Sequence, residues 1–517
     1  MRAPGAAEAA SSNPPASSNP PARPLRERLL RPTLPELWTF LAIVLPALAA
    51  LVRVPTLDLA YQLRAGADIL AGRGIPTTDA WVFTSAGRPW LDQQWGAQVV
   101  LAAIFDLGGW TGLAVLRAAI LAIAFGLVLL AVRWRAPGIG ARPAAWLTIA
   151  AFIVAAPALS LRPQLLGVLG FALTLALLTG RRRRPGLIWL MPAIAVAWAN
   201  VHGSFVLAPA LAGLAWLEDV HERSPRATRM LLVTVATGAA TLVTPFGLEG
   251  WRYAATLSLN SDVRTRIIEW QPPTLTDIPG ILFWSSVALV VVAVVVIARR
   301  RGTLAWPALL TLVAFGGLAA TAVRGIAWWP PVAAVTLAGL AFTPKTERYA
   351  APPPPLPQPR PVPRGSPLNA LIAAALIVGG VALLPVWRAT DPGTGAPNGL
   401  LVFAPSGVTT KLRDIARPAD RIWNPQPWGS WFEFAIPAPA YAFDSLIEVI
   451  PTDAWADGDI VTTAGAGWSS ILDERGVTIV VAEGDRTTPL ASALANDEGW
   501  RLVYADGEGT VWVRADR

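Results

Sequence analysis

Residues 279–301 read PGILFWSSVALVVVAVVVIARRR, an apolar run that ends in Arg299, Arg300 and Arg301. A helix needs about 20 apolar residues to cross the hydrocarbon core of a bilayer. Cytoplasmic loops of membrane proteins carry an excess of arginine and lysine. This stretch therefore predicts a transmembrane helix whose C-terminal end faces the cytoplasm.

Other runs along the chain have the same character. They are residues 37–54, 111–132, 143–160, 164–180, 186–199, 203–217, 230–244, 303–322, 326–342 and 368–386. Several are short for a span of about 20 residues, so their ends are approximate. A cleaved signal peptide is the alternative for the first run, but the many later spans favour a retained helix. The predicted fold is mainly α, a polytopic membrane helical bundle of about eleven transmembrane helices.

The composition agrees with a membrane protein and excludes several other classes. The chain is 54% hydrophobic and 15% charged, whereas soluble domains carry about 25% charged residues. It has no cysteine, which excludes disulfides, thiolate nucleophiles and cysteine-ligated metals. The net charge of +8 comes almost entirely from arginine in short loops between apolar runs. Membrane orientation explains these arginines better than nucleic-acid binding does.

Every second loop between the apolar runs is basic. These loops hold Arg133, Arg135 and Arg142; Arg181 to Arg184; Arg223, Arg226 and Arg229; Arg299 to Arg301; and Lys345, Arg348, Arg360 and Arg364. The positive-inside rule places them in the cytoplasm together with the arginine-containing N-terminal tail. We therefore predict a multi-pass cell-membrane protein with a cytoplasmic N-terminus and an extracytoplasmic C-terminus.

Composition also divides the chain into regions. Residues 1–36 are rich in Pro, Ala, Ser and Asn, which predicts a disordered cytoplasmic tail. Residues 37–387 form the transmembrane domain, with a large first outer loop at 55–110 and a proline-rich linker at 352–367. Residues 388–517 alternate β-type and helical segments, which predicts a small extracytoplasmic α/β domain. Its strands are expected at 400–403, 440–443, 478–482, 501–504 and 510–513, and helices at 409–416 and 489–496.

The first outer loop has helical signals of its own. Residues 58–71 space their apolar side chains as a helix does, and Gly72 and Gly74 end that segment. Residues 91–107 predict a second helix, which would lie along the membrane interface.

Polar residues collect at the outer ends of the apolar runs. No standard catalytic fingerprint is present, so placement is the main evidence. The candidate site residues are Asp58, Asp79, Asp92, Arg162, His202, Arg266, Glu269 and Arg324. The positive-inside rule disfavours arginine on this side, so these arginines need an anionic partner. A lipid-linked phosphate or diphosphate lies at this depth and binds guanidinium groups well.

Each carboxylate also has a structural interpretation. Asp58 is either the catalytic acid or base of the site or the N-cap of the predicted 58–71 helix. Asp79 lies in the segment Ile75-Pro76-Thr77-Thr78-Asp79, which is typical of a turn. Asp92 suits the N-terminus of the second loop helix.

The same holds for the other candidates. His202 either contacts a ligand or bonds to a neighbouring helix. Arg162 and Arg324 either bind a lipid phosphate or pair with loop carboxylates. Glu269, next to Trp270, suits a ligand contact or an interfacial anchor with a structural ion pair.

Several short motifs resemble those of GT-C glycosyltransferases. In the first outer loop they are Asp58, Gln62-Leu63-Arg64-Ala65-Gly66, Ile75-Pro76, Asp79, Phe83-Thr84, Gly87-Arg88-Pro89-Trp90 and Gln94-Trp95. Later they are Arg162-Pro163-Gln164, Trp198 to Ser204, Thr244-Pro245-Phe246-Gly247, Glu269-Trp270, Arg324, Trp428-Gly429-Ser430-Trp431, Phe443-Asp444, Gly467-Trp468, and Trp500-Arg501 to Val513-Arg514. The chain most resembles a bacterial branch near protein mannosyltransferases and aminoarabinose transferases.

The resemblance implies an enzyme that takes a sugar from a polyprenyl-phosphate carrier at the outer face. It implies that Asp58 is the general base and that arginines hold the leaving phosphate. Asp58 is followed by Leu59, where many family members have a second acid. No cofactor is predicted, a divalent metal requirement stays open, and the acceptor is not specified. The alternatives are a lipid-linked sugar transporter or flippase and a non-catalytic membrane scaffold.

Overall fold

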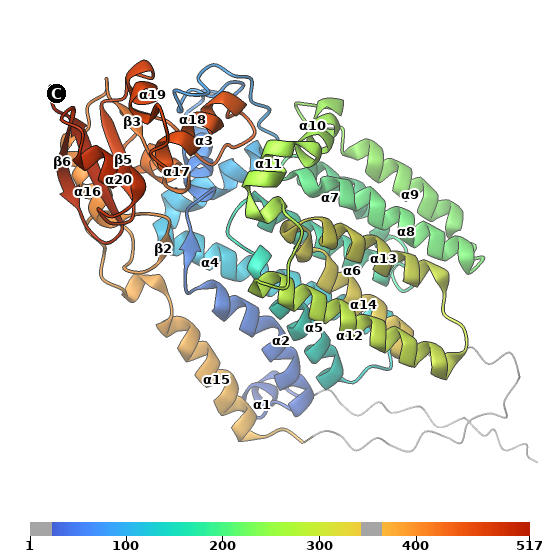
Figure 1. Cartoon of the computed structure of the whole chain (residues 1–517). Helices are drawn as coiled ribbons and strands as arrows, with labels where there is room; N and C mark the ends of the chain where they lie inside the picture. The colour runs from blue at the N-terminus through green and yellow to red at the C-terminus, as the bar shows by residue number, and fades with distance from the viewer. Residues whose placement is uncertain (1–22, 343–363) are drawn as a thin grey trace, which may run out of the picture.

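The computed structural model describes residues 23–342 and 364–517 (Figure 1). Most of the predicted linker, residues 352–363, lies outside this part of the chain. So do residues 1–22 of the predicted tail and the basic residues Lys345, Arg348 and Arg360. Within the tail that the sequence predicts to be disordered, Leu25–Leu30 forms a short helix, α1. Arg23 and Glu27 form an ion pair at 3.0 Å beside it.

Six helical stretches in the described residues are long and apolar enough to cross a membrane. They are α4 (Trp95–Arg135), α5 (Ala141–Ala155, extended to Ala158), α6 (Pro163–Gly180), α8 (Leu207–His221, preceded by a turn from Gly203), α12 (Ile278–Arg301) and α14 (Trp329–Phe342, preceded by a turn from Val323). Shorter apolar helices are α2 (Leu34–Ala50), α7 (Met191–Ala199, preceded by a turn from Leu187), α9 (Ala227–Ala240), α13 (Trp306–Thr321) and α15 (Pro367–Ala382). Each apolar run expected from the sequence corresponds to one of these helices. The chain is a multi-pass membrane protein, and the number of complete spans stays a prediction.

Helix α12 has the surface expected of a lipid-facing helix. Its side chains Leu289, Val291 and Val292 are 70%, 55% and 59% exposed. Leaving such side chains in water costs about 25 cal/mol per Å² of apolar surface, a cost that lipid removes. Asp277 caps the helix by accepting a hydrogen bond from the backbone N–H of Gly280 at 2.7 Å. The quoted stretch therefore forms a continuous helix up to its three terminal arginines.

Helix α4 lies at the centre of the molecule. It packs against α2, α6 and α3 (Leu59–Leu70). The sequence predicts a loop helix at 91–107 and a separate span from 111, and α4 likewise consists of two helical segments that meet at a kink. Gly109 interrupts that element with φ 55° and ψ −150°, a conformation that favours glycine. The helix is therefore broken at Gly109, between the predicted loop helix and the predicted span.

A mixed five-stranded sheet follows the last apolar helix. Its strands are β3 (Arg421–Trp423), β4 (Ala440–Tyr441), β5 (Ile479–Glu483), β6 (Trp500–Ala505) and β7 (Gly509–Arg514), in the order β4-β3-β5-β7-β6. β3 is parallel to both β4 and β5, and β7 is antiparallel to β5 and β6. The helices around it are α16 (Ser406–Ile415), α17 (Gln426–Ala435), α18 (Thr452–Thr462), α19 (Trp468–Glu474) and α20 (Pro489–Ala495).

One strand prediction for this region needs correction, and one strand was missed. The segment 400–403 contributes β2 (Leu401–Val402), which pairs with β1 (Val54–Pro55) outside the main sheet. β3 was not predicted, because three residues are too few to show an alternating pattern.

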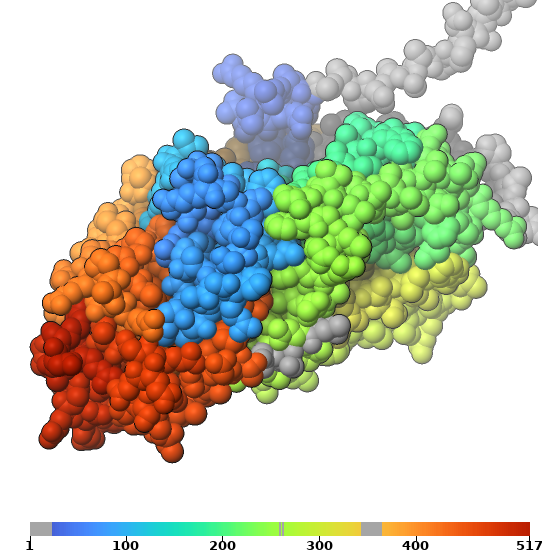
Figure 2. All heavy atoms as spheres, turned by 90° about the horizontal axis from the view of Figure 1, so that it is seen from above, coloured from blue at the N-terminus to red at the C-terminus, as the bar shows by residue number. Residues whose placement is uncertain are grey.

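The first outer loop joins the helical bundle to this C-terminal region. Thr84 donates a hydrogen bond to the carbonyl of Ala442 at 2.6 Å, and Ser445 donates to the carbonyl of Leu57 at 2.5 Å. α3 also packs against α17. Figure 2 shows the blue first loop beside the orange and red C-terminal region on one face of the molecule. The loop is therefore a packed layer between the helical bundle and the C-terminal region, and it positions one relative to the other.

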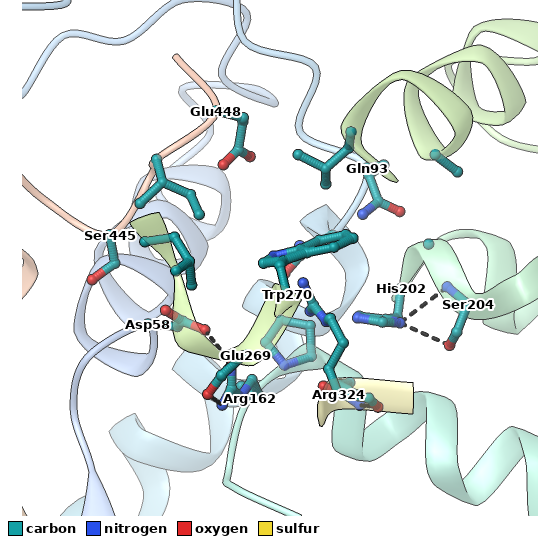
Figure 3. A pocket seen from close by; sticks show the side chains of 18 of the residues that line it. Asp58, Gln93, Arg162, His202, Ser204, Glu269, Trp270, Arg324, Ser445 and Glu448 are labelled. Carbon is teal, nitrogen blue, oxygen red and sulfur yellow. Dashed lines mark hydrogen bonds and ion pairs between the residues drawn. The ribbon is translucent and has the colours of Figure 1, made fainter. Parts of the chain in front are cut away.

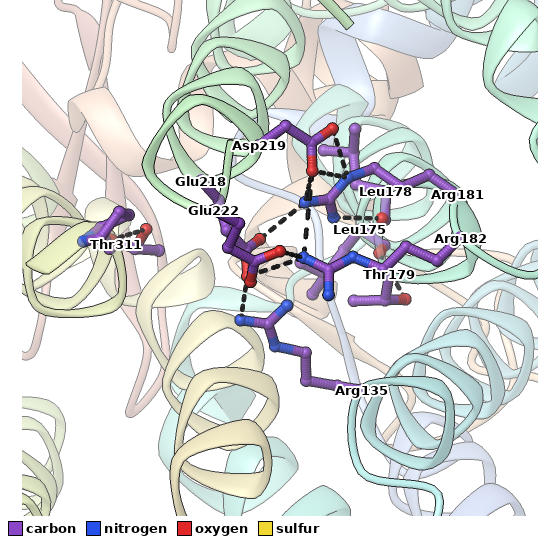
Figure 4. Close-up of polar contacts among 11 residues, drawn as sticks. Arg135, Leu175, Leu178, Thr179, Arg181, Arg182, Glu218, Asp219, Glu222 and Thr311 are labelled. Atoms are coloured by element: carbon purple, nitrogen blue, oxygen red, sulfur yellow. Dashed lines mark hydrogen bonds and ion pairs between the residues drawn. The ribbon is translucent and has the colours of Figure 1, made fainter. Parts of the chain in front are cut away.

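A charged cluster holds helices together at the C-terminal end of α6 (Figure 4). Arg181 pairs with Asp219 at 2.8 Å and with Glu218 at 2.9 Å, both on α8. Arg135, the last residue of α4, pairs with the same Glu218 at 2.5 Å. Arg162 lies at the opposite end of α6. This cluster is therefore separated from the candidate site by the length of that helix.

Candidate functional site

A cavity of about 760 Å³ lies where the loops predicted to be outside meet the C-terminal region (Figure 3). Its volume falls within the range of about 300–1,000 Å³ that is usual for ligand pockets. Six of the eight predicted site residues line it: Asp58, Arg162, His202, Arg266, Glu269 and Arg324. They come from five different loops, because Arg266 and Glu269 share one, and the fold brings them to one place.

Arg162 connects two carboxylates at the base of this cavity. It precedes α6 in extended backbone and donates to Asp58 at 2.9 Å and to Glu269 at 2.6 Å. Its second terminal nitrogen also bonds to Glu269. Asp58 occupies the N-cap position of α3, yet its side chain makes no capping hydrogen bond. The Asp58 carboxylate therefore points toward Arg162 instead of toward the helix that follows it.

The two carboxylates have different electrostatic environments. Burial raises the pKa of Asp58, and Glu269 raises it further, against the opposing effects of Arg162 and Arg324. Burial also acts to raise the pKa of Glu269, but Arg162 outweighs it and the net pKa is lowered. Glu269 is therefore the firmer ion-pair partner, and Asp58 is the carboxyl more readily protonated.

Arg324 is the cation available for a ligand. Among residues 23–342 and 364–517 it has no carboxylate within ion-pair distance. Its guanidinium lies 4.3 Å from the centre of the Trp270 ring. The Gln164 side chain donates to the Arg324 carbonyl at 3.2 Å and so holds the backbone. A guanidinium stacked on an aromatic ring keeps its hydrogen-bond donors free for a phosphate.

His202 presents a neutral imidazole beside Arg324. Burial, together with Arg324 and Arg162, holds the pKa of His202 well below its usual range. Its Nδ1 accepts a hydrogen bond from the backbone N–H of Ser204 at 3.0 Å and lies 2.7 Å from the Ser204 hydroxyl. Because Nδ1 accepts, the ring proton resides on Nε2. His202 can therefore donate one hydrogen bond to an anionic ligand.

Arg266 lines the cavity, but its guanidinium is bound to the C-terminal region. It pairs with Asp459 of α18 at 2.8 Å and lies 5.3 Å from the centre of the Trp455 ring. Arg266 is the last residue of α11 (Ser261–Arg266), the short helix that follows α10 (Leu248–Leu259). Its ion pair therefore ties α11 to α18.

Asp79 and Asp92 do not line this cavity. Asp79 accepts hydrogen bonds from the backbone of Trp81 at 2.9 Å and from the Ser85 hydroxyl at 2.6 Å, as a turn residue does. Asp92 accepts from Gln98 at 2.8 Å, and burial raises its pKa to about 8. Both carboxyls lie among residues of the first outer loop, and their predicted ligand roles remain untested.

The sequence analysis missed one carboxyl of this cavity, Glu448. It lies after β4 on the side of the cavity away from Arg162 (Figure 3) and accepts a hydrogen bond from Tyr253 at 2.6 Å. Burial raises the pKa of Glu448. Gln93 and Ser445 line the same cavity. No local signal marks Glu448, because it stands in a loop almost 400 residues after Asp58 and only folding brings the two together.

No group of three His, Asp or Glu side chains in the described part of the chain is arranged to hold a metal ion.

Comparison with known proteins shows weak structural likeness only. No protein-family model and no curated protein matches the chain. A structure of the Archaeoglobus fulgidus oligosaccharyltransferase, tethered with an acceptor peptide that contains the NVT sequon, has a TM-score of 0.48 and 12% identity, over 87% of this chain and 69% of that chain. Its apo form has a TM-score of 0.40 and 14% identity, over 87% and 70%. Neither likeness assigns the chain to a family.

Proposed function

We propose that this protein is a GT-C-type membrane glycosyltransferase that transfers a sugar from a polyprenyl-phosphate carrier to an acceptor at the outer face of the membrane. The observation that carries the proposal is the convergence of Arg162, Arg324, His202 and Asp58 on one cavity at the ends of apolar helices. Residues 388–517 are proposed to lie outside the cytoplasm, beside this cavity.

The leaving phosphate is proposed to bind at Arg324. Its guanidinium is stacked on Trp270 and has no ion-pair partner among the described residues. His202 adds a neutral donor through Nε2. Arg162 already holds two carboxylates, so it contributes positive potential more than free hydrogen bonds. A departing phosphate gains negative charge, and preorganised donors of this kind stabilise that charge.

Asp58 is proposed to be the general base for the acceptor hydroxyl. Arg162 favours the ionised carboxylate that a base requires, whereas burial raises its pKa toward the operating range. Glu448 is the competing candidate, because it faces the same cavity and is bonded to Tyr253 instead of to an arginine. A base must reach within about 3 Å of the acceptor oxygen. Substituting each carboxylate in turn can therefore show which of the two is the base.

The test compares Asp58→Asn and Glu448→Gln in the full-length protein reconstituted with polyprenyl-phosphate sugars extracted from the native membrane. Asp58→Asn should lower sugar transfer by about 100-fold or more, because general bases contribute about 10² to 10⁴ in rate. Binding of undecaprenyl phosphate, measured by native mass spectrometry, should be retained. Glu249→Gln, an exposed carboxyl change on α10, is the matched control.

Four outcomes would contradict the proposal or part of it. Near-wild-type turnover in Asp58→Asn together with loss in Glu448→Gln would move the base to Glu448. Sugar movement across vesicles without an acceptor would favour a transporter or flippase. Undecaprenyl phosphate binding that is unchanged in Arg324→Gln would remove the phosphate site, and a chain that neither binds nor transfers would be a scaffold.

A further inference from the structure

A second cavity, of about 800 Å³, lies within the C-terminal region. It opens at the carboxyl ends of the three parallel strands. Residues directly after β3 line it, as do Phe443 after β4 and Glu483 and Gly484 at the end of β5. α18 and the start of α20 form the remaining wall.

The strand order predicts a binding crevice at this position. The chain leaves β3 through α17 to reach β4 on one side, and later returns through α18 and α19 to β5 on the other side of β3. The connections therefore run in opposite directions from β3. Open α/β sheets bind ligands in the crevice that such a reversal leaves at the carboxyl ends of the strands.

The chemistry of this cavity differs from that of the first. None of the residues that line it is Arg, Lys or His. Its acidic side chains are Asp459, which Arg266 neutralises, and the exposed Glu483. A phosphate would gain no cation here and would meet a carboxylate. The ligand that fits is therefore uncharged or nearly so.

Aromatic and polar side chains both line the cavity. Trp455 stacks on Phe443 with ring centres 5.8 Å apart, and Trp423 meets Phe443 edge-on at 5.2 Å. Within the described chain, the side chains of Thr462 and Glu483 make no hydrogen bond to other protein groups. A rigid aromatic wall with free hydroxyl and carboxylate groups suits a ligand that has apolar C–H faces and many hydroxyls.

The two cavities adjoin. Gln426 and Pro427, at the start of α17, line both of them. The ion pair between Arg266 and Asp459 also crosses from one to the other, because Arg266 lines the first cavity and Asp459 the second. A ligand held in the second cavity therefore lies beside the first cavity.

We propose that this second cavity binds a neutral, polyhydroxylated ligand, that is, a carbohydrate without phosphate groups. The identification of this carbohydrate as the acceptor of the transferred sugar rests on the proposed function, whereas the proposal that a carbohydrate binds here does not. Glu483 and Thr462 accept and donate hydrogen bonds to the ligand hydroxyls, and Trp455 and Phe443 form the apolar wall.

The experiment titrates the full-length protein in nanodiscs with three neutral trisaccharides: maltotriose, mannotriose and cellotriose. Inorganic phosphate and a pentalysine peptide are the comparison probes. Binding is followed by saturation-transfer NMR. Thr462→Trp, which fills the mouth of the cavity from the exposed face of α18, should weaken trisaccharide binding by about tenfold or more, since losses of that size follow from occluding a pocket contact. Glu483→Gln should weaken it less.

The control is Ser470→Trp, which adds the same side chain at an exposed position of α19 outside the cavity. It should leave binding unchanged. Saturable binding that Thr462→Trp weakens by about tenfold or more, and that Ser470→Trp leaves unchanged, supports the proposal. Absence of binding for all three trisaccharides, or stronger binding of phosphate or pentalysine, overturns it. Undecaprenyl phosphate binding should be unaffected by Thr462→Trp, so this test fails or succeeds separately from the proposed function.

Discussion

Arg162 illustrates how one residue can hold several outer loops together. Its guanidinium bonds to Asp58 after the first span and to Glu269 in a later loop. A partly buried ion pair costs desolvation free energy, and removing one partner is worse, because it leaves the others unpaired. Arg162 therefore supports the fold and the charge of the cavity at once.

Arg162→Gln should lower the free energy of unfolding by about 1–3 kcal/mol, less than for a fully buried pair because Asp58 and Glu269 remain partly exposed. Chemical denaturation in detergent measures the change. Arg252→Gln, which breaks an exposed pair with Glu249, should cost about 0–1 kcal/mol. Adding Glu269→Gln to Arg162→Gln should restore part of the loss. Equal effects of the two arginine changes would show that the Arg162 contacts contribute little.

The same variant should show a pH dependence of defined sign. Without Arg162, burial would keep the pKa of Asp58 raised in the folded state and would no longer be opposed by this arginine. A raised carboxyl pKa stabilises the fold at low pH, and this stability is lost as pH rises through that pKa. The destabilisation relative to wild type should therefore be smaller near pH 4 than near pH 8. The opposite trend would contradict the assignment.

At the scale of elements, the approach of α3 to α4 decides where Asp58 lies. A Cβ added at Gly66 of α3 would lie 2.1 Å from the backbone oxygen of Gln98 on α4. A backbone atom cannot rotate away as a side chain can. Gly66 therefore lets α3 lie directly on α4. This contact sets the position of Asp58, which immediately precedes α3.

Gly66→Ala should destabilise the protein by about 1–3 kcal/mol, the usual cost of overpacking. Thermal unfolding in detergent provides the measurement, and undecaprenyl phosphate binding should weaken as α3 shifts. Gly317→Ala on α13 is the matched control, because nothing lies within 4 Å of the added Cβ. Helix propensity predicts that it is neutral or stabilising by up to about 1 kcal/mol. Similar losses in both variants would remove the packing explanation.

At the scale of the whole molecule, the first outer loop links the ends of the chain. β1, just after α2, pairs in parallel with β2, which begins the C-terminal region. Val82 also forms a β-bridge with Tyr441 of β4. Because residues almost 360 apart are hydrogen-bonded here, this loop and the C-terminal region must lie on the same side of the membrane.

The predicted orientation can be tested with single cysteines, because the chain has none of its own. Thr303→Cys lies in the loop after Arg299 to Arg301, and Ser470→Cys lies on α19; both positions are exposed. A membrane-impermeant maleimide added to intact cells should label Ser470→Cys only, and Thr303→Cys should react after the membrane is opened. Labelling of both from outside would contradict the arginine-based topology.

The local features of the sequence determined much of the architecture. Each predicted apolar run corresponds to one helix, because hydropathy and helical backbone hydrogen bonding depend on residues that are close in sequence. The predicted 58–71 helix corresponds to α3, and Asp79 makes the bonds of a turn residue. Local chemistry was also sufficient to select six residues that line one cavity.

Only the tertiary structure decided which charged groups meet. Glu448 entered the cavity and Asp92 did not, although both are acids next to predicted elements. Arg266 forms an ion pair with Asp459, some 190 residues later in the chain. Arg324 stacks on Trp270 and has no ion pair among the described residues. The short strand β3 likewise depends on its pairing with β5, far along the chain. The physical reason is that such contacts lower the free energy only between segments that folding has already brought together, so no local pattern can encode them.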